Sequence, residues 1–317
     1  MDSLFDTQEA GGFDRRGFDR GAMRDRLREL AARKIYVGGS SWKYEGWVDQ
    51  IYTRSLYSVR GKFSKKRFED TCLSEYATVF PTVCGDFAFY QFPPDSMWAR
   101  LFAQTPPSFK WGLKAPEQIT TPEFPVHPRY GATAGLKNPT HLDAELFTRS
   151  FLAPLAPYRA QTGVIIFEFN SMNSGREFVG KLDAFLAALP AGWPYAVEVR
   201  NSELLGARYF DCLRAHEVTH VYNAWARMPE MRDQMRMPGS RTSELIVARA
   251  LLKRGRPYEE AVRTFAPYTE VQEVNEPVRG ALREIVDVAL VDGTPAFVFV
   301  NNRLEGNSPG TIVAITS

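Results

Sequence analysis

The chain has 317 residues, is 44% hydrophobic and 24% charged, and carries a formal net charge of only +2. Such a chain is long enough to bury a complete core, and it fits one barrel domain of about 250 residues with a short extension. The near-neutral charge neither requires nor excludes a nucleic-acid partner, because a local basic patch matters more than the sum.

Three cysteines stand at scattered positions, and none belongs to a CxxC motif. This pattern suggests neither a disulfide framework nor a structural zinc site, and it indicates a reducing compartment. No apolar stretch approaches the roughly 20 residues that a membrane-spanning helix needs, and the amino terminus lacks the apolar core of a signal peptide. We therefore expect a cytoplasmic protein with no membrane partner.

The first 34 residues are expected to lie outside the main domain. Residues 1–20 contain the tandem repeat GFDRRGFDRG, which offers too little apolar surface to fold alone, so we predict a flexible arm. Residues 21–34 are good helix formers with Met23, Leu27 and Leu30 on one face, which predicts a lead-in helix. Residues 35–317 are then assigned to a single TIM-barrel domain.

Eight short apolar runs rich in Val, Ile, Phe and Tyr follow, and helical periodicity fills most of the gaps between them. Runs of this length predict buried strands, and their alternation with helices predicts parallel βα units. We therefore predict an α/β fold, a (β/α)8 TIM barrel, with strands in residues 35–41, 82–90, 109–116, 163–170, 195–201, 219–225, 244–251 and 296–303.

Three long connections follow predicted strands and therefore belong to the face at the carboxyl ends of the strands. Residues 42–63 and 117–140 exceed the usual loop length, and long loops in a compact domain are commonly lids or binding loops. Residues 226–243 hold four methionines, four arginines and two prolines, which suits either a mobile flap or a plain exposed loop.

Most of the runs end in a charged or amide side chain. Active sites of such barrels lie at the carboxyl ends of the strands, so these terminal residues are the first candidates for chemistry. They are Asp86, Lys114, Glu168, Glu198, Arg200, Asn223, Arg249 and Asn301.

Glu198 and Arg200 stand two residues apart in one predicted strand, so both side chains point to the same side, which in this apolar setting is the barrel lumen. Buried charges need partners, and Lys114, Glu168 and Arg249 supply them from other strands. One interpretation is a purely structural salt-bridge network. The other is a site in which pairing and burial tune pKa values for catalysis.

Two glutamates at the ends of adjacent strands also match the carboxylate pair of glycosidases. The two arginines and the lysine, however, should lower the pKa values of both glutamates and would suit a phosphate or carboxylate ligand. We therefore predict a small anionic substrate, phosphorylated or carboxylated, with a sugar-containing compound as one option. Lys114, Arg200 and Arg249 would clamp it, and Glu198 or Glu168 would act as general base.

The sequence HEVTH at residues 216–220 matches the H-E-x-x-H pattern of zinc proteases. That motif needs a continuous helix, whereas the β-branched and aromatic residues from Val218 onward predict a strand, so the two histidines lie on different elements. No metal ligand is assigned, although a Mg²⁺ or Mn²⁺ site through Asp86, Glu168 and Glu198 stays an alternative. No glycine-rich nucleotide loop is present, and no cofactor is predicted.

Several motifs occur in the order typical of one known family. They are GGSSW followed by a second tryptophan, FAFYQFP (87–93), WGLKAPEQIT (111–120), YAVEVRN (195–201) and VNNRLEGNSP (300–309). Over residues 35–310 the chain resembles the YecE-like family, catalogued as domain of unknown function seventy-two, a TIM-barrel group distantly similar in fold to sugar-isomerase and endonuclease-type barrels. The resemblance implies motif residues rather than a reaction: Ser40, Trp42, Trp47, Tyr90, Lys114, Glu198, Arg200, Arg249, Asn301, Asn302, Glu305 and Gly306.

The chain departs from the family near the expected mouth, at Cys84, Asp86, Glu168, Asn170, Asn201 and Leu251, which indicates a divergent branch with an altered pocket. Strand ends and motifs together give the predicted catalytic residues Glu198, Glu168 and Lys114. The predicted substrate-binding residues are Arg200, Arg249, Asn301, Asn302, Asp86, Ser40, Trp42, Trp47 and Tyr90. The two asparagines would orient the substrate by hydrogen bonds, and the three aromatic residues would stack on a sugar or base ring, although buried aromatics more often belong to the core.

Three functions stay open at this point. The first is a hydrolase or lyase that acts on the small anion. The second is a nucleic-acid-binding protein related to the endonuclease-like barrels, which would hold phosphates with the arginines of the arm and of residues 226–243. The third is a ligand-binding protein without catalysis. The oligomeric state is not predicted.

Overall fold

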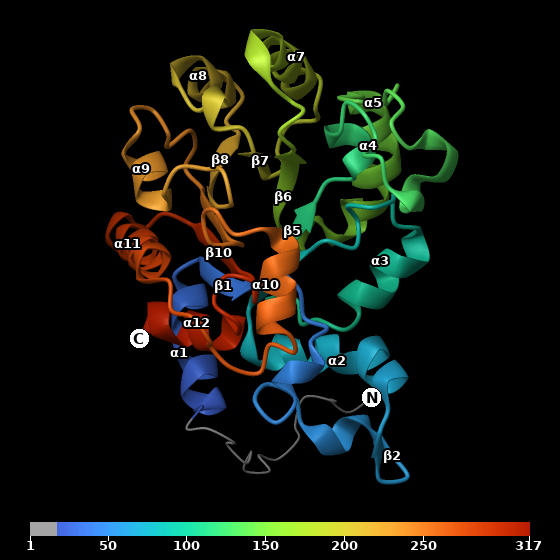
Figure 1. The fold of residues 1–317 in the computed structure, drawn as a ribbon, viewed down its shortest axis with the longest axis vertical. Coiled ribbons are helices and arrows are strands. Elements are labelled where there is room, and N and C mark those ends of the chain that lie inside the picture. Colours follow the sequence, from blue (N-terminus) through green and yellow to red (C-terminus); the bar gives the residue numbers. More distant parts are fainter. Residues whose placement is uncertain (1–17) are drawn as a thin grey trace.

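A computed structural model describes residues 18–317 and shows the predicted barrel. Eight parallel strands close in the order β1, β10, β9, β8, β7, β6, β5, β4 and back to β1 (Figure 1). The sequence predicted a strand at each of these places, and all eight are confirmed. Their bounds are β1 Ile35–Gly39, β4 Thr82–Gly85, β5 Lys110–Lys114, β6 Thr162–Phe169, β7 Tyr195–Val199, β8 Thr219–Ala224, β9 Ile246–Ala250 and β10 Ala296–Val300.

Most of the helices form a ring around the strands, while α10 lies in front of the middle of the barrel (Figure 1). Because α10 follows β9, it covers the carboxyl-end face. The helices are α1 Arg20–Ala32, α2 Lys65–Val79, α3 Asp95–Phe102, α4 Glu117–Thr120, α5 Ala144–Phe147, α6 Ala153–Leu155, α7 Gly175–Ala187, α8 Ala207–Ala215, α9 Met231–Arg236, α10 Tyr258–Phe265, α11 Glu276–Asp292 and α12 Ser308–Thr316. The predicted lead-in helix is α1; residues 1–17, most of the predicted arm, lie outside the described residues, and the end of the repeat supplies the N-cap Asp19 and the first residues of α1.

The lumen of the barrel is filled by aromatic side chains on its amino side. Phe297 and Phe299 of β10 have ring centroids 6.0 Å apart, and Tyr36 stacks on Phe297 at 4.8 Å. Gly112 of β5 and Gly163 of β6 make room for them, since a Cβ on Gly112 would lie 2.4 Å from the Phe299 ring. Packing therefore fills the lumen on the amino side of the barrel. Only the last inward-facing positions of the strands are left for chemistry.

The second predicted strand is shorter than predicted. β4 ends at Gly85, and residues 86–90 turn away, with the Phe89 backbone N–H donating to the Asp86 carbonyl at 3.0 Å. The reason is tertiary packing, because the Phe87 ring lies edge-on against tryptophans of α3 and β5 outside the lumen. The rest of this run therefore belongs to the rim of the barrel rather than to its wall.

The two long loops differ in what they do. Residues 42–63 pack on α2, with Tyr52 and Tyr57 buried and the β2–β3 hairpin (Ser58–Val59 and Lys62–Phe63) beside that helix (Figure 1). The prediction of a lid is therefore wrong for most of this segment, because its aromatic residues are needed for packing. Residues 117–140 do lie beside the mouth, where they contact the rim that follows β4.

The segment 226–243 is neither a flap nor a plain loop. It contains α9, which packs on β8 with Met231 and Gln234 buried. Two of its arginines, Arg232 and Arg241, lie 2.9 Å and 2.7 Å from carboxylates of α11. Met231 and Gln234 anchor the segment on the barrel. Two of its four arginines pair with α11 instead of facing an outside partner.

Candidate functional site

Five ionisable side chains meet at the last inward positions of the strands. They come from the ends of β5, β6, β7 and β9, and Glu168 and Glu198 are register partners on adjacent strands, so their side chains lie at one level. We call these five residues the charged layer: Lys114, Glu168, Glu198, Arg200 and Arg249. The sequence predicted that this set would meet, and the structure brings all five together.

Each carboxylate of the charged layer is shared by two or more cations. Glu168 Oε2 lies 2.6 Å from Arg249 Nη1, 3.0 Å from Arg200 Nη2 and 3.2 Å from Lys114 Nζ. Glu198 Oε2 accepts from Arg249 Nη1, and its Oε1 lies 2.8 Å from Arg200 Nη2 without hydrogen-bond geometry. Three cations thus face two carboxylates, which leaves one positive charge in excess.

The charged layer is buried to different depths. The Glu198 side chain is fully buried, Arg249 is 5% exposed and Arg200 8%, whereas Lys114 is 10% and Glu168 18% exposed. Glu168 and Lys114 are therefore the most exposed members, and a molecule entering the mouth meets them before it meets the arginines. Charges this deep interact strongly, because little water is available to screen them.

Unpartnered polar atoms concentrate at this end of the barrel. Twelve buried side-chain nitrogen or oxygen atoms of the described residues have no hydrogen-bond partner, and six belong to residues at the carboxyl ends of strands. An unsatisfied buried polar atom costs about 1–3 kcal/mol, so such a concentration favours a site that a polar ligand completes. The six atoms are Ser40 Oγ, Glu198 Oε1, Arg200 Nη1, Asn223 Oδ1, Arg249 Nε and Asn302 Nδ2.

The cations control the protonation of the charged layer. Burial raises the pKa of Glu168, but the charges of Lys114, Arg200 and Arg249 outweigh burial and hold that pKa well below its ordinary value. Burial lowers the pKa of Arg249, but the raising effect of Glu198 and other acidic neighbours is larger and holds that pKa well above its ordinary value. Glu168 is therefore a carboxylate and Arg249 a cation across the physiological pH range, and for Glu168 the predicted direction is confirmed.

The remaining polar residues predicted for the site also follow strand ends, but the structure shows no hydrogen bond from them to the charged layer within the described residues. Asn301 accepts a hydrogen bond from the Arg303 backbone N–H at 2.9 Å, which fixes its amide, and Asn302 accepts one from Ser308 N–H at 2.7 Å. Ser40 is buried, whereas Asp86 is exposed at the rim. The rim also carries Tyr90, which is 52% exposed.

Trp42 and Trp47 do not line the mouth. Trp42 is 4% exposed and meets the Trp111 ring edge-on at 5.7 Å, and Trp47 is fully buried against Tyr44 and Tyr52. Both belong to the core between the barrel and its outer layer. The predicted stacking of these two tryptophans on a ligand is therefore corrected, because core packing already occupies their faces.

Trp225 is a site residue that the sequence did not single out. The Arg200 guanidinium lies 4.0 Å from the centre of its ring, a cation–π contact in addition to the ion pairs with the carboxylates. Trp225 also packs against a small cluster that includes Ala261 and Phe265 of α10, which links that helix to Arg200. The signal was present, since Trp225 directly follows β8, two residues after the candidate Asn223.

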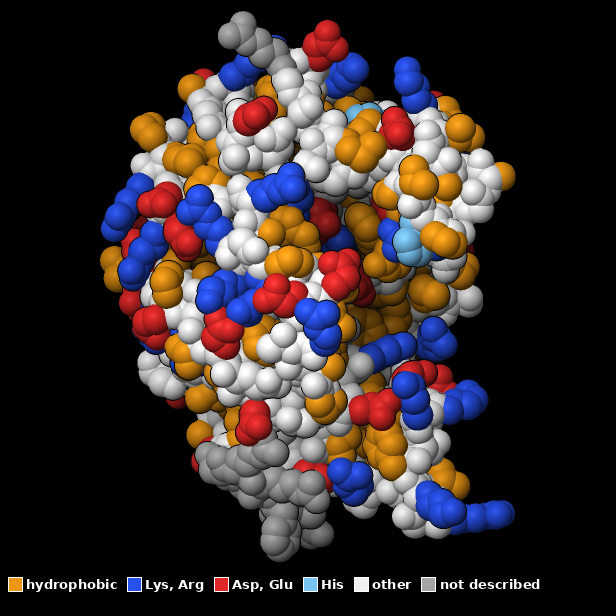
Figure 2. Space-filling model, in the orientation of Figure 1, with side chains coloured by type: hydrophobic (Ala, Val, Ile, Leu, Met, Phe, Trp, Pro, Cys, Tyr) orange, Lys and Arg blue, Asp and Glu red, His pale blue; other side chains and the backbone are white. Residues whose placement is uncertain are grey.

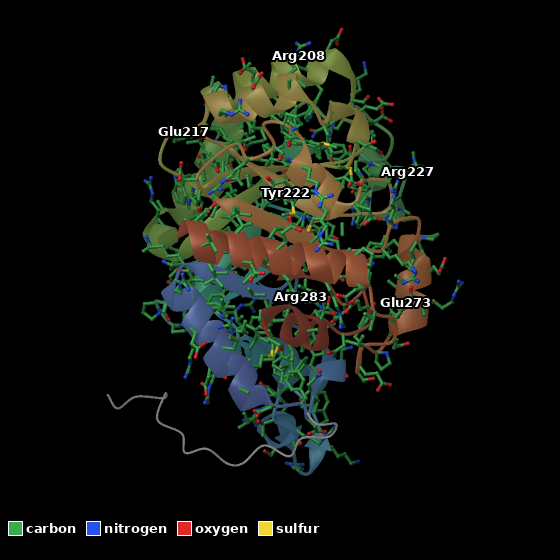
Figure 3. All side chains as sticks on the ribbon, turned by 90° about the vertical axis from the view of Figure 1, so that its left-hand side faces the viewer. Arg208, Glu217, Tyr222, Arg227, Glu273 and Arg283 are labelled. Carbon is green, nitrogen blue, oxygen red and sulfur yellow. The ribbon has the colours of Figure 1, made fainter. Side chains whose placement is uncertain are left out.

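The HEVTH motif does not form a metal site. His216 caps α8 and lies 2.8 Å from Asp183, whereas His220 is buried in β8 beside Tyr209, so the two histidines lie on different elements as predicted. Figure 3 shows Glu217 on the side of the molecule opposite to Arg227 and Glu273, which lie near the carboxyl-end face. Within residues 18–317 no three His, Cys, Asp or Glu side chains are grouped so that they could hold a metal ion.

A His220→Phe variant is expected to lose less stability in acid than the wild type. Burial lowers the pKa of His220 to about 3, whereas histidine in an unfolded chain titrates near ~6.5. Below about pH 6.5 the unfolded state therefore takes up a proton that the folded state refuses, at up to about 1.4 kcal/mol per pH unit. Urea unfolding at pH 7.5, 6, 5 and 4.5 measures this slope, and parallel curves for the two proteins would contradict the expectation.

Two surface cavities are separate from the charged layer, although one of them borders it. This one, of about 380 Å³, lies beside the segment after β8 and is lined by Lys253, Arg254, the first turn of α11 and Trp225, whose ring contacts Arg200. The other, of about 630 Å³, lies between α5 and α7 and contains His141, whose Nε2 is 2.9 Å from Asn173 Oδ1. Neither cavity collects the buried unpartnered atoms that mark the barrel mouth.

A closed parallel barrel with polar side chains at its strand ends defines a TIM-barrel protein that carries its candidate site on the usual face. The family model described as "Protein of unknown function DUF72" matches residues 36–317, and the chain belongs to this family. The resemblance seen in the sequence motifs is thereby confirmed. None of the helices in the described part of the chain is long and apolar enough to cross a bilayer.

Relatives with known sequences or structures agree with this assignment. The chain is 28% identical to the UPF0759 protein YecE of Escherichia coli (strain K12) over 169 residues, 53% of this chain and 49% of the relative. It thus spans about half the length of the curated relatives it matches. A DUF72 family protein from Thermotoga maritima has a TM-score of 0.60 at 19% identity, covering 89% of this chain and 96% of that one. A DUF72 family protein from Enterococcus faecalis has a TM-score of 0.60 at 17% identity, covering 89% and 94%.

Proposed function

We propose that this protein is an enzyme of hydrolase or lyase type that binds a small phosphorylated or carboxylated compound in the charged layer. The observation that carries the proposal is the excess of positive charge there, three cations against two carboxylates, together with the unpartnered atoms Arg200 Nη1 and Arg249 Nε. Guanidinium groups bind phosphate and carboxylate through strong, charge-assisted hydrogen bonds.

The layer offers an anion both charge and unused donors. Arg200 is held by the Trp225 ring and by two carboxylates, so its free Nη1 is fixed in place before a ligand arrives. Preorganised donors of this kind bind without a large loss of side-chain entropy. The Ser40 hydroxyl and the Asn223 amide oxygen, both at strand ends, add neutral hydrogen-bonding atoms without a partner.

Glu168 is the carboxylate best placed for proton transfer. It is partly exposed, whereas Glu198 is fully buried between two arginines and acts in this proposal as the group that positions them. A bound anion adds negative charge beside Glu168 and offsets the cations that lower the pKa of this carboxylate. Binding would then make Glu168 a stronger base at the moment when the substrate is present.

The test measures thermal unfolding with a panel of phosphorylated sugars, nucleotides and carboxylates, followed by analysis of any stabilising compound for turnover. A ligand at about 100 times its Kd adds about 2.7 kcal/mol of stability. We expect this gain in the wild type and in the control Arg227→Ala, an exposed arginine near the same face, and its loss in Arg200→Ala. Arg200→Lys, which keeps the charge, guards against a simple folding defect.

Two outcomes would contradict the proposal in different ways. Equal stabilisation of the wild type and both Arg200 variants would place the ligand elsewhere. Stabilisation that depends on Arg200, with every bound compound recovered unchanged, would show a binding protein without catalysis.

A further inference from the structure

We infer that the anion bound at this mouth carries a planar ring, so that the ligand is a nucleotide-like compound with its phosphate in the charged layer and its ring between Tyr90 and Tyr258 at the rim. This inference rests on the proposed function and specifies its substrate class. It is carried by two aromatic rings that are exposed at the mouth and nowhere else in the described chain.

Exposed aromatic rings are rare in this protein. Among the large hydrophobic side chains that are exposed within residues 18–317, only Tyr90, at 52%, and Tyr258, at 43%, are aromatic. Tyr90 follows β4, and Tyr258 begins α10 after β9, so both lie on the carboxyl-end face. Aromatic rings left in water at the entrance of a polar pocket are typical of sites that stack a ring of the ligand.

An arginine holds each of these tyrosines in place. The Arg129 guanidinium lies 4.6 Å from the centre of the Tyr90 ring and 4.7 Å from that of Tyr130. The Arg303 guanidinium lies 4.5 Å from the centre of the Tyr258 ring. An arginine on one face of a ring leaves the other face free for a ligand, and guanidinium groups stack on bases as well.

The rim is continuous with the charged layer. The Lys114 ammonium lies 3.6 Å from the centre of the Phe89 ring, and Phe89 touches Tyr90 with ring centroids 5.3 Å apart. A contact path thus runs from the Lys114 ammonium through Phe89 to the exposed Tyr90 ring. One molecule can therefore touch a cation of the charged layer and a ring of the rim together.

The surface of this face has the shape that the inference needs. Figure 2 shows a hollow just to the right of the middle, beside the position of α10, with acidic and basic side chains near its upper end and hydrophobic side chains along its length. Charge at one end and apolar surface along the hollow match a phosphate joined to a flat ring.

The test compares inorganic phosphate, ribose 5-phosphate and nucleoside monophosphates by titration calorimetry at low salt. We expect the nucleoside monophosphates to bind about tenfold more tightly than ribose 5-phosphate, because stacking on aromatic side chains adds about that factor or more per base. Tyr90→Ala and Tyr258→Ala should each remove most of this gain and leave the affinity for inorganic phosphate unchanged. Tyr90→Phe keeps the ring and should keep the gain, and Leu56→Ala, an exposed apolar residue on the α2 side, is the matched control.

The results separate this inference from the proposed function. If ribose 5-phosphate and inorganic phosphate bind but the base adds nothing, the inference is wrong and the anion site stands. If no phosphate compound binds, the inference is wrong, and the proposed function is wrong for phosphorylated compounds and stands only if a carboxylate binds. A 5′-phosphorylated tetranucleotide distinguishes the two sources of such a ligand. If it binds more tightly than the mononucleotide, with an affinity that falls steeply as salt is added, the ligand is the end of a nucleic-acid strand. If the two bind equally, the ligand is a free nucleotide.

Discussion

Replacing Glu198 with glutamine is expected to lower the free energy of unfolding by about 3–5 kcal/mol, the cost of breaking a buried ion pair from one side. The variant keeps the shape of the side chain but leaves three cations facing Glu168 alone. Since Glu198 is fully buried, water cannot replace the lost charge. Urea unfolding of the wild type and the variant at neutral pH measures the difference.

A surface pair provides the control for this prediction. Glu284 of α11 lies 2.9 Å from Arg232, but both side chains are largely solvent-accessible, with exposed fractions of 40% for Glu284 and 45% for Arg232. Glu284→Gln should therefore cost less than about 1 kcal/mol. The double variant Glu198→Gln with Arg249→Met should lose less than the sum of the single losses, because it removes one of the repelling cations. Equal losses at the two glutamates would contradict the account of the charged layer.

Replacing Glu168 with glutamine is expected to tighten phosphate binding about tenfold and to abolish any turnover. The change releases Lys114, Arg200 and Arg249 from a shared carboxylate and raises the excess of positive charge. It also removes the proposed base. Titration with inorganic phosphate and a rate assay on the substrate found in the panel test the two parts, and weaker phosphate binding would contradict the role of these cations.

The same variant has a defined pH signature. The pKa of Glu168 is well below its ordinary value in the folded protein, so its ion pairs stabilise the fold fully above the unfolded-state pKa of about 4.3. That contribution is lost as the pH falls through the lowered folded-state pKa. The stability difference between wild type and variant should thus be constant from pH 6 to 8 and shrink in acid.

Much of this molecule could be predicted from sequence because its barrel strands are short apolar runs with polar ends. The two-residue spacing of Glu198 and Arg200 was enough to place both in the lumen, since side chains alternate along a strand. The family resemblance was confirmed, and the five residues of the charged layer were identified without any structure.

The errors have a common physical cause, which is that tertiary contacts decide what an aromatic residue does. Trp47 and Trp225 both follow barrel strands, yet one fills the core and the other stacks on Arg200. The position of α10 across the mouth, and with it the exposure of Tyr258, depends on how the chain returns from β9 to the outer ring. No local periodicity encodes that path.

The most direct test of the central claim is a crystal structure of the protein soaked in inorganic phosphate. The account predicts a phosphate at the barrel mouth, with oxygens within hydrogen-bond distance of Arg200 Nη1 and Arg249 Nε. A mouth without phosphate, while the ion occupies the cavity beside Lys253 and Arg254, would contradict it.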